Sequence, residues 1–446
     1  MGLFDFFFRK GERTIPENQF YQEFFQELRS IGAKITAPSF KAFIEKGYNF
    51  NPHAYTTVSY KARQKSRVSF ELFEVKNEKA LKNFKACNNP IEKRLFKNEA
   101  LEKNETSALA ELLKNPNEFD TWADFMFEGS GFSDITGNSF VYGLTPAGFP
   151  ENYFTKIYQM PPQAVDIVPG DALQPVKGYS IDERFSLIGK DFIDCDKVMH
   201  LKNFNPNKKN NEGNFNFYGL SPMEPLLRSL DRSNESYSAS LALLQNGGPA
   251  GMISPKGDRL IKPDDLKKLE KAWNAKFAGG KNKGKWLKSG VEMLWQQIGQ
   301  NSTDLELLDS NKADLADFAR AYGIPLELLG NADSKYKNKE EAKKSVWEEV
   351  LIPELTKLRD GLNLWLVPGH SEFDGKQYFI DYNISNIASL QADLNTLSAR
   401  LLAEWAAGLW TRNQVLIMMD KEPSKNPIHD LYIYEIPTTN GNTSEA

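Results

Sequence analysis

Residues 219–249 are GLSPMEPLLRSLDRSNESYSASLALLQNGGP, and residues 304–325 are DLELLDSNKADLADFARAYGIP. In the first segment, Ser221 and Pro222 stand in the order typical of a helix N-cap and first turn, and the Gly-Gly-Pro run after Asn246 is a helix stop. Apolar residues recur at helical spacing in both segments. The pattern predicts two long helices, each bordering a module of about fifty residues, and so a two-helix stalk with a small tip.

Composition limits the classes of protein to which the chain can belong. It has 446 residues, 40% of them hydrophobic, which is enough for two to four packed units. The net charge of −4 argues against a tightly held polyanion. Two cysteines, Cys87 and Cys195, exclude a disulfide scaffold and a four-cysteine zinc site. The apolar run of MGLFDFFFRK is too short for a signal peptide, and no run is long enough for a membrane span, which predicts a soluble chain made in the cytoplasm.

The remaining segments predict a mixed α+β body. Residues 51–64, 107–113 and 121–127 have helical periodicity, whereas 76–90 is lysine-rich and expected to be a solvated segment. Short apolar runs predict strands at 68–75, 135–142, 153–158, 165–168, 176–180, 197–201 and 379–382. Toward the C-terminus we expect a long helix over 339–366 kinked at Pro353, and two further helices over 389–407 and 412–419.

The module between the stalk helices has a pattern of its own. A strand at 252–253, a helix over 263–277 and strands at 285–287 and 291–295 predict a β-α-β-β unit. The segment from Lys256 to Lys288 contains eleven basic and four acidic residues. This excess is either a solvated face or a docking surface, for which the candidates are Lys281, Lys283, Lys285 and Trp286. Trp286 begins a strand and is equally compatible with the core of the unit.

No motif predicts catalysis or a cofactor. The segment GGKNKGKW at 279–286 has the glycine and lysine spacing of a phosphate-binding loop, but Trp286 stands where a magnesium-binding Ser or Thr is needed. The histidines share no metal-ligand spacing with each other or with a cysteine, and no carboxylate pair is suited to acid-base chemistry: His53, His200, His370, His429, Asp134, Glu404 and Asp420. We therefore predict that the chain is not an enzyme and holds no metal or cofactor.

Seven short motifs, in order, resemble the portal protein family of tailed bacteriophages, of the siphophage type. They are NPN at 115–117 with Thr121 and Phe125, ITGNSFVY at 135–142, MPP at 160–162, VMH at 198–200, YGLSPM at 218–223, NGGP at 246–249, and YGIP at 322–325 with LLG at 328–330. The resemblance extends from Asn51 to Met419. The first fifty residues and the loop at 205–216 are longer than is usual in the family.

The resemblance implies an α+β portal fold and a ring, usually of twelve subunits, at one capsid vertex. The parts would be an N-terminal extension (1–50), a wing (51–218), a first stem helix (219–246), a clip (247–302), a second stem helix (303–325), a tunnel loop with a long kinked helix and the completion of the wing (326–388), a crown (389–420) and a flexible tail (421–446).

The implied role is a conduit for DNA packaging and ejection in the virion, assembled in the host cytoplasm. Implied partners are further copies of the chain, terminase, a head-tail adaptor, the major capsid or scaffolding protein, and double-stranded DNA bound without sequence preference, but no membrane. The alternative is another head-tail connector or minor capsid protein.

Two sets of residues are expected at the channel. The second stem helix carries five acidic residues and one lysine, which would present negative charge to passing DNA: Asp304, Glu306, Asp309, Lys312, Asp314 and Asp317. The alternative is that these side chains face solvent on the outside. The polar loop 331–338 is the tunnel loop by resemblance, or else an ordinary exposed connection, with Asn331, Asp333, Ser334, Lys335, Tyr336 and Lys337 as candidate contacts.

Overall fold

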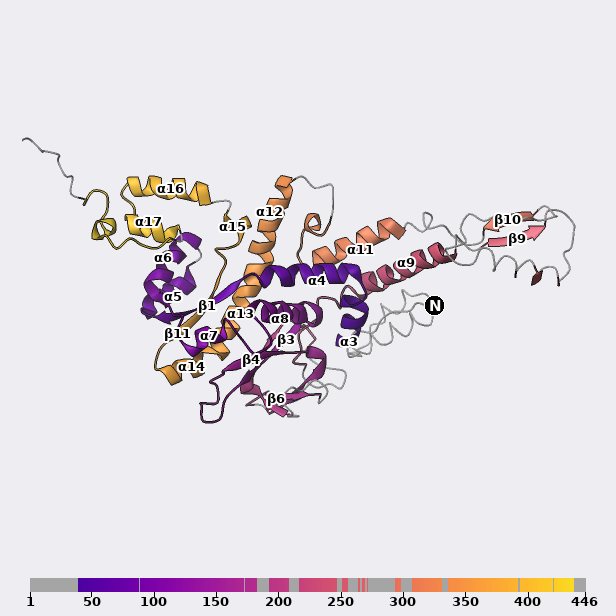
Figure 1. Ribbon diagram of the computed structural model, residues 1–446, viewed down its shortest axis with the longest axis horizontal. Helices are drawn as coiled ribbons and strands as arrows, with labels where there is room; N and C mark the ends of the chain where they lie inside the picture. The colour runs from indigo at the N-terminus through magenta and orange to yellow at the C-terminus, as the bar shows by residue number, and fades with distance from the viewer. Residues whose placement is uncertain are drawn as a thin grey trace, which may run out of the picture. The chain divides into compact units, whose positions relative to one another are not determined.

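The computed structural model describes residues 39–87, 89–171, 173–182, 192–207, 216–246, 251–255, 264, 267–268, 271, 293–297, 307–330, 336–391, 394–419 and 421–436. Figure 1 labels the helices and strands. The chain divides into two compact units. The first comprises Met1–Thr57, Pro206–Asn216 and Pro222–Leu326, and the second comprises Val58–Asn205, Phe217–Ser221 and Glu327–Ala446.

One sheet of the second unit joins segments from both ends of the chain. Its strand order is β11 (Tyr378–Asn383), β1 (Ser69–Val75) and β2 (Leu101–Lys103), all antiparallel, which confirms the strands expected at 68–75 and 379–382. Helices α5 (Glu78–Ala86) and α6 (Pro90–Ala100) contribute to the core beside it. The expectation of a solvated segment over 76–90 is wrong because Asn77 caps α5, whose Ala80 and Phe84 are buried one turn apart.

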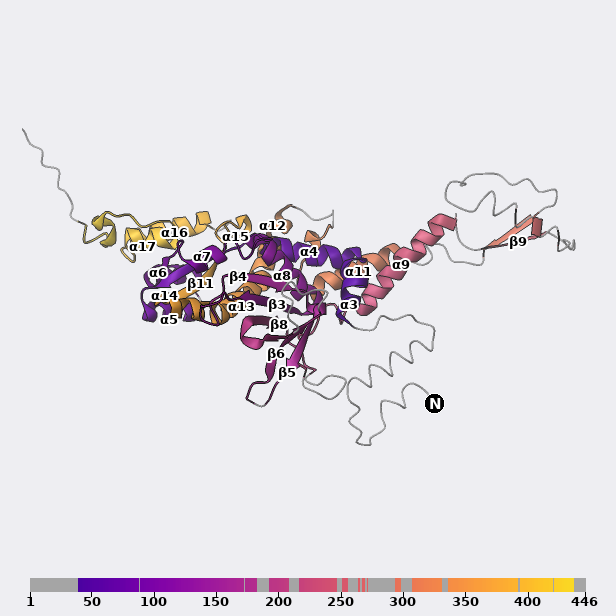
Figure 2. The ribbon, with the colours of Figure 1, turned by 60° about the horizontal axis from the view of Figure 1, so that its bottom comes forward.

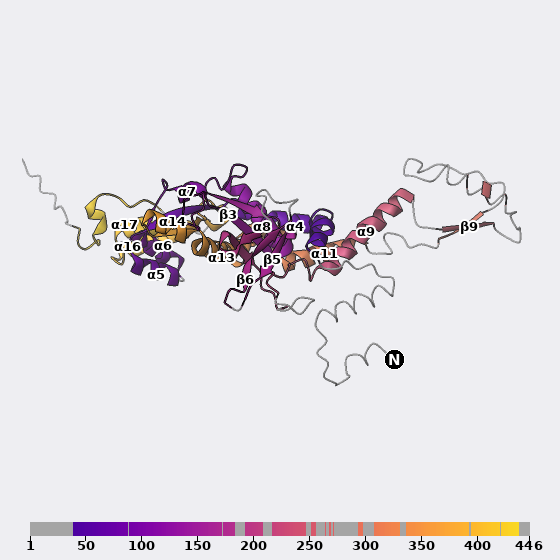
Figure 3. The same cartoon turned by 90° about the horizontal axis from the view of Figure 1, so that it is seen from below.

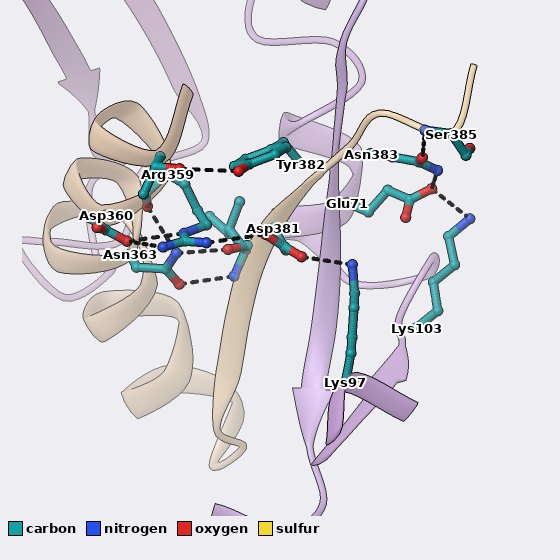
Figure 4. A network of polar contacts seen from close by, with 12 residues as sticks. Glu71, Lys97, Lys103, Arg359, Asp360, Asn363, Asp381, Tyr382, Asn383 and Ser385 are labelled. Atoms are coloured by element: carbon teal, nitrogen blue, oxygen red, sulfur yellow. Dashed lines mark hydrogen bonds and ion pairs between the residues drawn. The ribbon is translucent and has the colours of Figure 1, made fainter. Parts of the chain in front are cut away.

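Polar contacts fasten β11 to its neighbours (Figure 4). Asp381 on β11 accepts a hydrogen bond of 2.7 Å from Lys97 of α6 and lies 3.6 Å from Arg359. Asn363 donates to the carbonyl of Ile380 and accepts from its amide, so β11 is held from both sides.

Two three-stranded antiparallel sheets form the other β-structure in the described residues of this unit, and they share one apolar cluster (Figure 2). The first has the order β4 (Lys156–Met160), β3 (Asn138–Leu144), β8 (Val198–Lys202), and the second β5 (Val165–Pro169), β6 (Val176–Ile181), β7 (Phe192–Asp194). Strands were expected near all of these positions except β7. Short 3₁₀ turns, η2 (Pro162–Ala164) and η4 (Cys195–Lys197), lead into β5 and β8.

The helix before β3 is longer than expected. After α7 (Ala108–Leu112), α8 runs from Trp122 to Thr136, with a capping box between Thr121 and Asp124 at its start. It ends at Gly137, whose φ of 76° lies in the left-handed region that favours glycine. The expectation of a helix over 121–127 and a strand from 135 is therefore corrected at both boundaries.

A buried ion cluster links α8 to two other helices of the second unit. The Lys61 ammonium of α4 (Pro52–Lys65) donates to Asp134 of α8 and to Glu354 of α13 (Ile352–Trp365), at 2.7 Å each. Lys65 pairs with the same two carboxylates. Burial lowers the pKa of Lys61, but the two carboxylates outweigh this effect, so its pKa is raised.

The long helix expected over 339–366 is present but interrupted. It comprises α12 (Tyr336–Val346), a π-helical turn η7 (Trp347–Leu351) and α13. Pro353 has no amide hydrogen to donate, and the wider turn just before it accommodates this loss. The chain continues directly into α14 (Val367–Asp374), which was not expected and ends at Gly375.

The C-terminal helices are α15 (Ala388–Gln391), α16 (Leu394–Ala406) and α17 (Arg412–Met418), near the two expected segments. Helices α17 and α16 pack through Leu401, Val415 and Met418, and α17 lies against α6, where Arg94 donates to the Met418 carbonyl (Figure 3). A 3₁₀ turn, η8 (Pro427–Asp430), follows.

The first unit contains α3 (Phe40–Ala42), the π-helix η1 (Phe43–Tyr48), the start of α4, α9 (Leu227–Asn246), β9 (Gly251–Pro255), β10 (Met293–Gln297) and α11 (Leu307–Ala321), before the 3₁₀ turn η6 (Leu326–Leu328). Strands β9 and β10 lie at two of the strand positions expected in the module, and they pair antiparallel. Its strand at 285–287 and most of its helix at 263–277 lie outside the described residues.

Candidate functional site: the paired helices α9 and α11

Helices α9 and α11, which lie in the two segments expected to form a stalk, pack against each other (Figure 1). Their contact is apolar near the first turn of α9 and the last turns of α11. Leu230 is 1% exposed and Phe318 is fully buried. Fully burying a side chain of this size contributes about 1.5–3 kcal/mol, so these residues fix which face of each helix is covered.

The start of α9 differs from its prediction. Ser221 does not cap the helix, because α9 starts six residues later, and its hydroxyl donates to the Ile135 carbonyl at 2.6 Å. Residues 222–226 form turns, and α9 begins at Leu227.

A buried ion pair joins the two helices. The Asp314 carboxylate of α11 is fully buried and accepts hydrogen bonds from the Arg232 guanidinium of α9, through Nε at 2.8 Å and through Nη2. Asp317, one turn along, accepts from the Ser229 hydroxyl at 2.8 Å and from Arg320 at 3.1 Å. The hydrogen bond to Asp314 raises the pKa of Arg232. The pair fixes the register of α9 against α11.

The N-terminus of α4 is fastened to α9 by Asn51. Its side-chain oxygen caps α4 by accepting from the amides of His53 and Ala54, while its side-chain nitrogen donates to Ser233 and Asn234 of α9 at 3.1 and 2.8 Å. Since Asn51 is only 1% exposed and Ser233 is fully buried, the bond between them is sheltered from water.

The His53 ring lies between Tyr237 and Phe318. Burial lowers its pKa, an effect that nearby Asp314 partly opposes. His53 is therefore mainly neutral at pH 7.

In the second unit, two of the quoted motifs bind each other. Asn138 accepts from the Gly219 amide at 2.7 Å and donates to the Gly219 carbonyl at 3.2 Å. Its side-chain oxygen also lies 3.0 Å from His200 Nε2, and burial lowers the pKa of His200 to about 3. The imidazole is thus neutral and donates to Asn138. This polar knot holds the segment that leads, along the chain, into α9.

Glycine is required in the knot because the two backbones touch. A Cβ on Gly219 would lie 2.3 Å from the Gly137 carbonyl oxygen, and a Cβ on Gly137 would lie 2.1 Å from that of Leu220. These approaches explain why both motifs contain glycine at these positions.

Comparison with known proteins places the chain in a family. The model of the family described as phage portal protein matches residues 86–420, well over half of the chain. The chain belongs to the phage portal protein family. Curated relatives include an uncharacterized protein of Rickettsia bellii, 30% identical over 66% of this chain and 73% of the relative, and the portal protein of Enterobacteria phage HK97, 22% identical over 49% of each.

Solved structures show the same fold. A chain in the neck of an empty gene transfer agent particle, computed with C6 symmetry, has a TM-score of 0.60 and 22% identity, covering 88% of this chain and 96% of that one. A chain in the native neck, computed with C12 symmetry, has a TM-score of 0.58 and the same identity, covering 86% and 94%. The expected α+β portal fold is confirmed, and the portal identity is favoured over another connector or minor capsid protein.

Among the residues that we predicted to line the portal channel, Asp314 requires a correction. It is fully buried and paired with Arg232, so it cannot present its charge at a surface of the chain. Lys312 is exposed and Asp317 is partly exposed. Asp304, Glu306 and the side chain of Asp309 lie outside the described residues.

The other two predicted sites of the portal fall largely outside the described residues. These comprise all four clip candidates, Lys281, Lys283, Lys285 and Trp286, and the loop residues 331–335. Tyr336 and Lys337 were expected in the tunnel loop but are the first residues of α12.

Within the described ranges, no group of three or more His, Cys, Asp or Glu side chains is arranged to hold a metal ion. Nor does any described helix have the length and hydropathy to cross a bilayer. His370, buried against Tyr153, lies 2.9 Å from the Phe154 carbonyl and packs as a structural side chain.

Proposed function

We propose that this chain is the portal subunit of a phage or phage-like particle, and that copies of it form a ring, usually of twelve, at one capsid vertex. Double-stranded DNA would pass through the ring during packaging and ejection, without sequence-specific contacts. The match to the portal family over residues 86–420 carries the proposal. The fold it shares with a chain in a neck computed with twelvefold symmetry supports the ring.

In this proposal α9 and α11 are the stem, and the second unit contributes the wing and crown. A stem that surrounds DNA must let it slide, which favours a surface that does not bind phosphates strongly. Asp304, Glu306 and Asp309 would supply negative charge near the start of α11, whereas Asp314 serves the contact with α9. Lys335 and Lys337 would touch phosphates transiently where the tunnel loop meets α12.

The module between α9 and α11 would be the clip, on which terminase docks first and the head-tail adaptor later. The basic excess around Lys281, Lys283 and Lys285, beside Trp286, supports an acidic docking partner. Reversing the three lysine charges should weaken terminase binding in a salt-dependent way while leaving rings intact. Normal affinity of such rings at low salt would contradict this assignment.

We propose a structural role in the virion, after assembly with capsid or scaffolding protein in the host cytoplasm, and no catalytic activity. Electron microscopy of the purified full-length chain and of native particles tests the proposal. We expect rings with a central opening, and one such ring per particle. A chain that stays monomeric alone and is absent from the vertex of native particles would contradict the proposed function.

A further inference from the structure

One aromatic side chain of the second unit projects into solvent from a rigid loop. Phe119 is 73% exposed. The loop is fixed by Asn117, whose side-chain oxygen accepts from the amides of Phe119 and Asp120 at 2.8 and 2.9 Å, and whose side-chain nitrogen donates to the Ile157 carbonyl at 3.0 Å. Exposing a phenyl ring is unfavourable, and holding it rigidly lowers the entropy lost when it binds a partner.

A carboxylate stands beside this ring in the sequence and is also held in place. Glu118 Oε2 accepts from Lys156 Nζ and from the Tyr158 hydroxyl, both at 2.8 Å. These bonds, that of Lys156 foremost, lower the pKa of Glu118 to about 2, so it is ionised at neutral pH. A carboxylate has room for further donors beyond two.

Elsewhere in the same unit lies a pocket of about 230 Å³. This volume is below the roughly 300–1,000 Å³ of pockets for drug-sized ligands and suits a single large side chain. Its walls are largely apolar, and the lining comprises Val75, Leu81, Lys85, Asn363, Val367, Ser371, Gln377, Tyr378 and Phe379.

The polar groups of the pocket are mostly engaged. Asn363 bonds to the backbone of Ile380, and Gln377 donates to Glu78. The Lys85 ammonium lies 5.0 Å from the centre of the Phe379 ring and has no ion-pair partner in the described part of the chain. The pocket therefore offers apolar walls and one available cation.

We propose that Phe119 of one subunit inserts into this pocket of the neighbouring subunit, with Glu118 approaching Lys85. Phe119 is not among the residues lining its own pocket. A rotational ring needs two different complementary patches on every subunit, since each copy contacts the next in a head-to-tail manner. An exposed phenyl beside a carboxylate and an apolar pocket beside an ammonium meet that requirement on one chain. The inference rests on the proposed ring.

Two variants separate the two halves of the contact. Phe119→Asp removes the inserted ring, and Gln377→Trp fills the pocket from an exposed position. Leu173→Asp, at a side chain that is 96% exposed, is the matched control. Self-association of the full-length chain is measured by sedimentation and mass photometry. Each of the two variants should weaken it by about 30-fold or more, as expected for an interface hot spot, and the control should not change it.

The decisive experiment mixes the two variants, because one intact head-to-tail contact can form between a Gln377→Trp chain and a Phe119→Asp chain. The Gln377→Trp chain keeps its Phe119 and the Phe119→Asp chain keeps its pocket, so the mixture should give one-to-one dimers that do not close into rings. Lys85→Glu should weaken association, and adding Glu118→Lys should restore part of it.

Three outcomes are informative. If the wild-type chain forms rings and Phe119→Asp assembles equally well, this contact is wrong while the portal ring stands. The contact is also refuted if each variant is defective but the mixture yields no dimer. If the wild-type chain forms no ring under any condition, including within native particles, the proposed function itself falls.

Discussion

Replacing Arg232 by methionine tests whether the α9–α11 pair depends on its buried ion pair. Methionine keeps an apolar stem of similar length but removes the guanidinium that donates to Asp314. Asp314 is fully buried, so its charge would lose its cation without gaining water. Leaving a buried charged acceptor unpaired costs about 3–5 kcal/mol when both partners are buried. Since the Arg232 side chain is 53% exposed, we expect about 2–3 kcal/mol.

Hydrogen exchange of the α9 and α11 amides measures this change locally. A loss of about 2–3 kcal/mol in the opening free energy corresponds to exchange about 30–150 times faster in the protected part of both helices. Arg320→Met is the matched control, because Arg320 is 76% exposed and bonds to the partly exposed Asp317. Its effect should stay within about 0.5 kcal/mol.

The pH dependence of the Arg232→Met variant gives a second readout. Without its cation the buried carboxyl of Asp314 should have a pKa above its value of about 3.9 in the unfolded chain. The folded variant then takes up a proton before the unfolded chain does. The stability that the variant has lost relative to the wild-type chain is therefore largest above the raised pKa of Asp314, and this loss becomes smaller as the pH falls through that pKa. If Arg232→Met exchanges like the control, and its deficit does not change with pH, Asp314 does not depend on Arg232.

Three further predictions concern the polar knot. Asn138→Leu should cost about 3 kcal/mol or more in urea unfolding, because buried partners including the Gly219 amide lose their bonds; a loss below about 1 kcal/mol would contradict this role. Gly219→Ala should destabilise the fold by contact with Gly137, whereas Gly131→Ala, which meets nothing within 4 Å, should be neutral or slightly stabilising, and equal effects would argue against the close approach. The pKa of His200 is about 3 in the folded chain and about 6.5 in the unfolded chain, so the free energy of unfolding should fall as the pH drops below about 6.5. His200→Gln should make this fall smaller, and the same pH dependence in the variant and the wild-type chain would contradict the prediction.

The sequence predicted the helices and strands that have a clear hydrophobic periodicity of their own. The helix at 51–64, the strands β1 and β11 and the two helices of the stalk all have strong periodicity, and the structure contains them. Helix α5 was missed because its lysines suggested a solvated segment, although Ala80 and Phe84 supply a short apolar face. The π-helical turn before Pro353 was not predictable in detail, since a proline can be accommodated by a kink or by a wider turn.

Contacts between distant segments could not be predicted from one sequence. Asn138 and Gly219 lie in two motifs that were quoted for the family resemblance, yet nothing in either motif shows that they bind each other. Arg232 was not singled out at all, because an arginine among the serines of α9, with Arg228 one turn before it, is typical of a solvated helix face. Its partner, Asp314, lies on another helix and is 82 residues away in the sequence. The pairing can be recognised only when the packing of the two helices is known.

The ion pair changes the electrostatics expected of the stem. Counting residues from Asp304 to Asp317 gives five acids and one lysine, but Asp314 is neutralised by Arg232 inside the chain, and Asp317 is bonded to Ser229 and Arg320. The Lys312 side chain is exposed. The described part of α11 is therefore less negative than the count implies. A charge reversal that tests the effect of stem charge on DNA movement should therefore be made at Asp309. A lysine at position 314 would repel Arg232 and disrupt the contact between α9 and α11, which would obscure any effect on DNA.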